Sequence, residues 1–254
     1  MKRRREPLSP TTIGAIILGA GVLGITIGHV NNHGWRWTGL LAEVAIPMGT
    51  DLLVVSIVIL MVDRLAERRE QVRLRQQLVR EMSSSDHGLT ARALLELDRR
   101  GWLAEGALVS AQLTGASLEG VILELVDLHG ADLAGANLEG TNLSRARLSS
   151  CNFTGAAMSR VILEMADLTG ARLSDAKLDR ADMAKARLGG ADLAGASLVE
   201  ADLAGTDLRG ADLRGADLSD SRVDAMLIDG TTRWDDDTRW PTGFQPDSSL
   251  RALH

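Results

Sequence analysis

A five-residue pattern that runs from residue 106 to residue 230 limits what this chain can fold into more than any other feature. The clearest copies read ADLAG at 131–135 and ADLRG at 211–215, and the stretch divides into 25 units with no insertion. The first position is small, usually Ala. The third position is Leu in most units, and its exceptions are Phe153, Met158, Met183, Val223 and Ile228.

A period of five fits neither of the two regular secondary structures. Five steps along an α-helix turn the chain by about 500°, so the Leu residues would spiral to every side and form no stripe. In a straight strand, an odd period would send successive Leu residues to opposite faces. Every Leu can point inward only if the chain bends once per unit.

Bending once per unit makes each unit one short side of a coil, and coils must stack to bury their Leu rows. An interior this narrow accepts one large side chain per side, which explains the Ala at the other inward position. Gly at the fifth position, as in Gly115 and Gly135, suits the bend. The second position, often Asp or Asn, is expected to point outward.

The A-[D/N]-L-x-x array resembles the pentapeptide-repeat proteins, whose fold is a right-handed quadrilateral β-helix. The resemblance implies four units per coil and hence about six coils over residues 104–230. At about 4.8 Å per stacked strand, the domain would be about 30 Å long. The family defines a fold far better than it defines a function.

Two apolar runs precede the repeats, at residues 12–30 and 44–62. Each is long enough for a helix that crosses a bilayer. We therefore interpret residues 1–62 as a two-helix transmembrane hairpin. A signal peptide is the competing interpretation of the first run, but no small-x-small cleavage site follows it and a second apolar run does.

Basic residues flank the two runs on one side only. Residues 2–5 read KRRR, and Arg64, Arg68 and Arg69 follow the second run, whereas the loop at 31–39 holds only Arg36. The positive-inside rule then places both termini and the repeat domain in the cytoplasm. The expected location is a multi-pass protein of the bacterial inner membrane, with the lipid bilayer as its first partner.

Polar and small residues within the predicted spans are candidate sites. Asp51 would lie near mid-depth and Glu43 at the outer edge. A carboxylate at the membrane centre is a functional candidate, with a polar helix contact as its plainer interpretation. The small residues Ala20, Gly24 and Gly28 recur every four positions and predict a helix-packing face, within the hairpin or in a homo-oligomer.

Two further segments flank the repeats. Residues 63–103 predict a charged juxtamembrane helix over 63–82 and a short capping helix over 90–100, followed by Trp102 and Leu103 as a lid over the first coil. Residues 231–254 hold three of the few aromatic residues and predict a C-terminal cap. The stretch TRWPTGFQP at 238–246 resembles a tail of many bacterial pentapeptide-repeat proteins.

One irregularity of the repeat predicts an interaction surface. VILEL at 121–125 recurs as VILEM at 161–165, two coils later if each coil has four sides. Ile122, Leu125, Ile162 and Met165 then lie on one side and point outward. This apolar patch predicts a docking or self-association surface, unless the chain's own helices cover it.

The sequence holds no catalytic, cofactor-binding or metal-binding constellation, and we expect neither an enzyme nor a bound cofactor. No Ser/His/Asp set, Cys/His set, phosphate loop or calcium loop is recognisable. The single cysteine, Cys151, occupies an inward small position and is expected to be structural.

These observations predict a non-catalytic, membrane-tethered scaffold that presents one side of the β-helix to a cytoplasmic protein. One alternative is an oligomeric membrane assembly, a channel or sensor, in which Asp51 lies in the helix contact. A second is a DNA mimic that binds topoisomerase, as the family resemblance implies. The repeat has 19 acidic and 11 basic residues, whereas duplex DNA of this length carries about 18 charges. The net charge of −8 is less than half of that charge, so a DNA mimic is not favoured. We also expect neither a nucleic-acid partner nor a small-molecule substrate.

Overall fold

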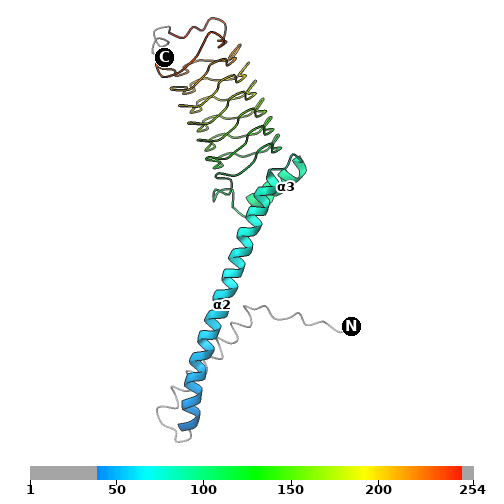
Figure 1. Cartoon of the computed structure of the whole chain (residues 1–254), viewed down its shortest axis with the longest axis vertical. Coiled ribbons are helices and arrows are strands. Elements are labelled where there is room, and N and C mark those ends of the chain that lie inside the picture. Colours follow the sequence, from blue (N-terminus) through cyan, green and yellow to red (C-terminus); the bar gives the residue numbers. More distant parts are fainter. Residues whose placement is uncertain (1–38, 248–254) are drawn as a thin grey trace. The chain divides into compact units, whose positions relative to one another are not determined.

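The computed structural model of the chain describes the backbone of residues 39–247 and the side chains of residues 54–247. Two helices precede the repeats, α2 over Gly39–Met82 and α3 over His87–Arg99 (Figure 1). The chain divides into two compact units on either side of the Leu74–Arg75 junction. The caps and the repeats described below all belong to the second unit.

The predicted transmembrane hairpin lies largely outside these residues. The run at 12–30, with Ala20, Gly24 and Gly28, is outside the described backbone, and Glu43 and Asp51 are outside the described side chains. The run at 44–62 forms part of α2. A search of the described residues finds no helix with the length and apolarity that a membrane crossing requires.

Helix α3 begins and ends where its capping residues predict. The side chain of Asp86, the N-cap, accepts hydrogen bonds from the N–H groups of Gly88 and Leu89 at 2.8 and 3.4 Å. The helix ends at Arg99, and Gly101 follows it with a φ of 73°. The prediction began this helix at residue 90, because it overlooked Asp86 as a capping residue.

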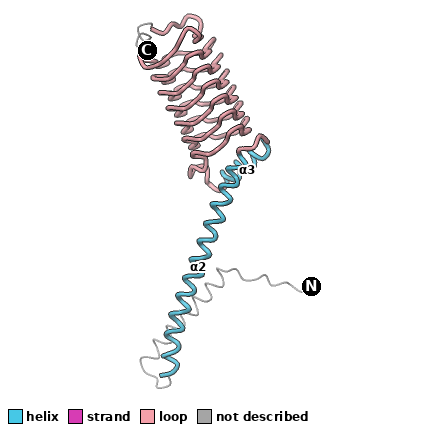
Figure 2. The backbone as a smooth tube through the Cα atoms, viewed as in Figure 1, coloured by secondary structure: helices cyan, strands magenta, loops and turns pink. Residues whose placement is uncertain are grey.

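The repeats form a coil with four sides. Parallel bridges join each second-position residue to the residue 20 positions later, as in Gln112 to Asp132 and Ile122 to Asn142. Four such columns start at Gln112, Ser117, Ile122 and Asp127, so four units complete one turn. Figure 2 shows the stacked coils as loops, because each side contributes a single bridged residue. The predicted four-sided architecture is confirmed.

In the unit 131–135, every backbone N–H has a defined partner. Asp132 N–H donates to the preceding coil at 2.9 Å, and the N–H groups of Leu133 and Gly135 donate to the following coil at 2.7 and 2.9 Å. The N–H of Ala136, the first residue of the next unit, donates to the Leu133 carbonyl at 3.0 Å and closes the corner. One N–H remains, that of Ala134.

The outward Asp or Asn satisfies this remaining donor. Ala134 N–H donates to Oδ1 of Asp132 at 3.2 Å. The side chain thus replaces a ladder bond within its own unit, as in an Asx turn. The same bond recurs at Asp127, Asn137, Asn142, Asn152, Asp167, Asp182, Asp192, Asp202, Asp207, Asp212 and Asp217.

The fifth residue of each unit adopts the left-handed conformation. Gly135 has a φ of 62°, and several non-glycine residues share this conformation, among them Leu125 at 62° and Met165 at 58°. The left-handed region costs a residue with a Cβ about 1–2 kcal/mol. The preference for Gly at this position therefore follows from the backbone, as predicted.

The core is a set of stacked inward side chains. Leu113, Leu133, Phe153 and Leu173 are fully buried and occupy equivalent positions in successive coils. Burying each such side chain stabilises the fold by about 1.5–3 kcal/mol. The third position is thus the buried one, which confirms the inward direction predicted for the Leu rows.

Polar substitutes at the inward first position bond to the coil before them. The hydroxyl groups of Thr141 and Thr206 donate to central-residue carbonyls 23 positions earlier, at 2.6 and 2.8 Å. The Cys151 thiol does the same at 2.9 Å, to the carbonyl of Leu128. These residues can be buried because the carbonyl of the preceding coil accepts a second hydrogen bond.

The N-terminal end of the coil is covered by helical residues. Met82, Ala93 and Leu97 are fully buried, and Ser117 N–H in the first coil donates to the Ser84 carbonyl at 3.1 Å. Trp102 and Leu103, which were predicted to form the lid, are only partly buried, so they cover this end less than Met82, Ala93 and Leu97 do. The Arg100 guanidinium lies 5.1 Å from the centre of the Trp102 ring.

The C-terminal segment extends the coil before it caps it. Arg233 bridges to Asp212 and Arg239 bridges to Asp217, so two more sides form with one and two extra residues. Thr232 and Thr238, which precede them, donate to inner carbonyls at 3.0 and 2.9 Å. The coil thus continues past residue 230, the end expected from the sequence, because Thr-Arg-Trp forms a repeat unit whose inserted residues break the five-residue period.

Aromatic rings complete this C-terminal cap. The ring centres of Trp234 and Trp240 lie 6.1 Å apart in an edge-to-face arrangement, and those of Trp240 and Phe244 lie 5.3 Å apart. Both Trp residues take the third position of their units, where the earlier units place Leu. Their larger rings close a wider final coil.

Candidate functional site

The apolar patch, which consists of Ile122, Leu125, Ile162 and Met165, lies along one side of the coil. Ile122 bridges to Asn142, and Asn142 bridges to Ile162, so the two Ile residues are separated by one coil. Leu125 and Met165 occupy the corners that end the same two units. The four residues therefore lie in two units of one side, with one coil between them.

All four side chains of the patch are open to solvent. The exposed fractions are 72% for Ile122, 66% for Leu125, 36% for Ile162 and 48% for Met165. The helices of this unit do not cover the patch, which was the alternative left open by the sequence. An exposed aliphatic cluster on an otherwise polar side is the kind of surface that binds another molecule.

The patch residues also lack two features that stabilise other units of the coil. Ile122 and Ile162 have no side-chain acceptor for the N–H two residues later, which Asp or Asn provides elsewhere. Leu125 and Met165 hold bulky side chains in the left-handed conformation that Gly occupies most often. Exposed residues that lower the stability of their own units are typical of residues retained for function.

A groove of about 660 Å³ adjoins the patch at its N-terminal end. Helix α3 forms one wall with Ala91, Leu94 and Leu95, and the first complete coil forms the other with Ile122 and Leu125. Leu95 is itself more than half exposed. Leu94 and Leu95 are not among the site residues expected from the sequence, because nothing in a short helix indicates which side of the coil it will adjoin.

The ionisable groups that line this groove are acidic apart from one histidine. Asp98 of α3 and Glu119 and Glu124 of the coil lie in the groove lining, together with His87. Glu119 accepts a hydrogen bond from the Asn137 amide at 3.2 Å. Among the described residues, none of the three carboxylates forms an ion pair.

The side that begins at Asp127 has a different character. Its second positions alternate between acid and base, as Asp127, Arg147, Asp167, Arg187 and Asp207. Arg147 pairs with Asp127 at 3.1 Å and Arg187 with Asp167 at 3.8 Å. Neighbouring coils therefore neutralise one another on this side, which leaves it polar and without a dominant charge.

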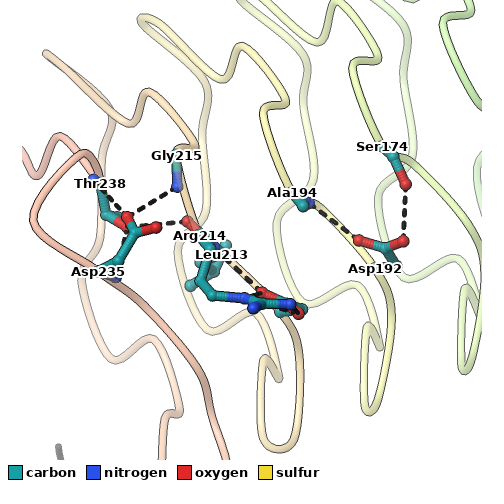
Figure 3. A network of polar contacts seen from close by, with 9 residues as sticks. Ser174, Asp192, Ala194, Leu213, Arg214, Gly215, Asp235 and Thr238 are labelled. Atoms are coloured by element: carbon teal, nitrogen blue, oxygen red, sulfur yellow. Dashed lines mark hydrogen bonds and ion pairs between the residues drawn. The ribbon is translucent and has the colours of Figure 1, made fainter.

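The carboxylates near the C-terminal end are held by hydrogen bonds within and between coils. Asp192 accepts from Ala194 N–H at 3.1 Å and from the Ser174 hydroxyl at 2.6 Å, and Asp235 accepts from Gly215 N–H at 2.9 Å (Figure 3). Three hydrogen bonds from the Arg214 guanidinium lower the pKa of the Asp212 carboxyl. These carboxylates thus stabilise the turns between successive sides of the coil.

A second hollow, of about 470 Å³, lies at the corner that bears Arg160 and Arg180. Arg180 bonds to both carboxylate oxygens of Glu200 at 2.8 and 3.1 Å, and Arg160 pairs with Glu139 at 3.7 Å. Both cations are thus already neutralised by the chain's own acids, so this hollow offers no charge for an anionic ligand.

The described residues show no arrangement suited to catalysis. They contain no cluster of three His, Cys, Asp or Glu side chains that could hold a metal ion. Burial raises the pKa of the Cys151 thiol to about 12, so it is neither a nucleophile nor a ready metal ligand at neutral pH. His129 bonds to the Ser149 hydroxyl at 2.9 Å on the surface.

Comparison with known families matches the coil region. The family described as "Pentapeptide repeats" matches eight copies over residues 108–145, 127–164, 146–184 and 186–222. The repeat region of the chain belongs to the pentapeptide-repeat family. The four-sided coil described here agrees with the right-handed quadrilateral β-helix of that family.

Solved structures of pentapeptide-repeat proteins are similar to this one. The protein Rfr23 from the cyanobacterium Cyanothece 51142 is 30% identical, with a TM-score of 0.38, over 56% of this chain and 99% of its own. A protein from the Arabidopsis thaliana thylakoid lumen is 31% identical, with a TM-score of 0.22, over 43% and 67%.

A third similar structure is QnrB1, a plasmid-mediated fluoroquinolone resistance protein. It is 17% identical, with a TM-score of 0.25, over 51% of this chain and 84% of its own. A comparison with curated proteins gives no match. The bridges between coils define the repeat fold, and the function must be argued from the surface of this protein.

Proposed function

We propose that this pentapeptide-repeat protein is a non-catalytic interaction module that binds a protein partner on the apolar patch. The observation that carries the proposal is the coincidence of Ile122 and Ile162, exposed and one coil apart, at outward positions that most often hold Asp or Asn. Burial of exposed apolar surface against a partner removes it from water and so favours binding.

The experiment compares partner capture by the full chain and by two variants. In Ile122→Asn/Ile162→Asn the two aliphatic side chains are removed, but the replacements suit their positions in the unit. Arg172→Asn is the control, because it also places Asn at the second position of a unit, two units along the coil from Ile162 and thus on the opposite side. We expect the double variant to lose the proteins that wild type and control retain. Equal recovery by all three would refute the proposal.

The same proposal includes a membrane tether through residues 12–30 and 44–62, which would hold the repeat domain on the cytoplasmic side of a bacterial inner membrane. It is supported by the apolar runs and by the basic residues that flank them. Fractionation of cells that express the full chain provides the test. We expect the chain in the membrane pellet after alkaline washing, and its recovery in the soluble fraction would contradict the tether.

The DNA-mimic alternative is less well supported than a docking surface. A mimic needs uncompensated negative charge along its surface. Here arginines compensate many of the acids, as Arg147 does for Asp127, Arg214 for Asp212 and Arg222 for Asp202. An assay of topoisomerase supercoiling with the purified chain would test this alternative, and we expect no inhibition.

A further inference from the structure

The groove between α3 and the first complete coil is continuous with the apolar patch, because Ile122 and Leu125 belong to both. Its opposite wall consists of Ala91, Leu94 and Leu95 from α3. On the other face of α3, Thr90, Ala93 and Leu97 are buried. The helix thus has a buried face and a second apolar face that lines the groove.

The lining of this groove includes three acids and no Lys or Arg. Elsewhere many acids are paired, as Asp127 is with Arg147 and Glu200 with Arg180. Among the described side chains, the groove acids Asp98, Glu119 and Glu124 form no ion pair. Acids left unpaired beside an exposed apolar surface attract a partner that supplies the missing cations.

We propose that the groove binds a basic amphipathic segment of the partner protein. Aliphatic or aromatic side chains of that segment would pack against Leu95, Ile122 and Leu125, while its Lys or Arg side chains would pair with the three groove acids. Helix-in-groove recognition uses this combination of apolar anchors and charged flanks. This inference rests on the proposed function, because it specifies which chemistry the patch selects.

A second copy of the chain fits the groove less well. In a symmetric dimer the same surface contacts itself, so Asp98, Glu119 and Glu124 of one copy would face the acids of the other. Like charges brought together across an interface oppose association. Self-association therefore stands as the competing outcome of the test.

The test uses two synthetic peptides of 18 residues, each with Leu at helical spacing. One carries Lys at its polar positions and the other carries Glu. Fluorescence anisotropy measures their binding to the full chain. We expect saturable one-to-one binding of the Lys peptide, weakened by salt, and no binding of the Glu peptide.

Variants show whether binding occurs in the groove. Asp98→Asn/Glu119→Gln/Glu124→Gln removes the three groove charges, whereas Asp175→Asn/Asp220→Asn/Asp237→Asn makes the same change in net charge elsewhere on the surface. Three exposed ion pairs are together worth about a tenfold change in affinity. We expect the groove variant to bind the Lys peptide about tenfold more weakly than the control variant does. An equal loss of affinity in both variants would show that the Lys peptide responds only to the net charge of the protein, and would overturn the inference.

The outcomes separate this inference from the proposed function. If the groove variant keeps its affinity but Ile122→Asn/Ile162→Asn still abolishes partner capture, the basic-segment inference fails and the docking surface stands. If the Ile variant captures its partner normally, the docking surface fails. Sedimentation of the full chain checks the competitor, because self-association that the Lys peptide reverses would assign the groove to a second copy.

Discussion

The N–H of Ser144 donates to Oδ1 of Asn142 at 3.0 Å, whereas Ile122 and Ile162, directly below and above Asn142 in the same column, have no group that could accept such a bond. One column therefore contains a residue whose side chain accepts this turn hydrogen bond, Asn142, and two residues whose side chains cannot accept it. This contrast separates what stabilises the coil from what is available to bind a partner.

Replacing the two Ile residues with Asn is therefore predicted not to destabilise the protein. Asn supplies the missing acceptor, and a hydrogen bond of this kind contributes about 0.5–1.5 kcal/mol. Asn142→Ile, the reverse change in the same column, should lower the free energy of unfolding by about 1 kcal/mol. Thermal denaturation of the three chains measures both effects, and a large loss of stability in Ile122→Asn/Ile162→Asn would contradict the account of the turn.

The corner residues predict two opposite effects at equivalent positions. Gly135 has a φ of 62°, and a Cβ there would contact nothing within 4 Å, so Gly135→Ala changes only the backbone preference. We expect it to cost about 1 kcal/mol. Met165→Gly removes a side chain from the same conformation and should increase stability. Urea denaturation tests the pair, and a stabilising Gly135→Ala would contradict the assigned conformation.

The sequence was sufficient to predict the coil because one constraint repeats at every unit. A period of five with a buried third residue allows only one direction for Leu133 and its equivalents, and the structure buries them. The outward direction of Ile122 and Leu125 followed from the same count. Their exposure could not be predicted, since it depends on where α3 lies.

The two caps were predicted less accurately because they depend on particular contacts. Nothing in the spacing showed that Ser84 would bond to Ser117 across the first edge. The Thr-Arg-Trp units escaped recognition because their extra residues break the five-residue count. Single contacts at the ends of a repeat carry no periodic signal, so the sequence does not reveal them.

The C-terminal cap predicts a strong effect at one aromatic residue. The Trp240 ring contacts both Trp234 and Phe244, at 6.1 and 5.3 Å between ring centres. Removing a fully buried Trp side chain costs about 3–5 kcal/mol. Because the Trp240 ring is half-buried, we expect Trp240→Ala to lower the free energy of unfolding by less than this. Trp240→Phe is the control and should retain most of the stability. Equal melting temperatures for the Ala and Phe variants would show that the cluster does not close the coil.

The acidic corners predict a loss of stability in acid. Hydrogen bonds from Arg214 lower the pKa of Asp212, and hydrogen bonds from Ser219 and Arg239 lower that of Asp217. A carboxyl with a lowered pKa in the folded state stabilises the fold above its ordinary value of 3.8, and this contribution is lost as the pH falls through the lower folded value.

Asp212→Asn isolates one such contribution. The stability difference between wild type and this variant should be full at pH 7 and should shrink below pH 3.8. Denaturation at a series of pH values provides the measurement. A difference that stays constant down to pH 2 would show that the Asp212 charge has no role.

Cross-linking of paired cysteines tests the stacking on which the patch and the groove both depend. Ile122 and Asn142 face each other in adjacent coils, where strands lie about 4.8 Å apart, a spacing that a disulfide can bridge. Ile122 and Arg147 lie on different sides. Under mild oxidation, Ile122→Cys/Asn142→Cys should form an intramolecular disulfide and Ile122→Cys/Arg147→Cys should not. A cross-link in the second pair without one in the first would contradict the four-sided coil.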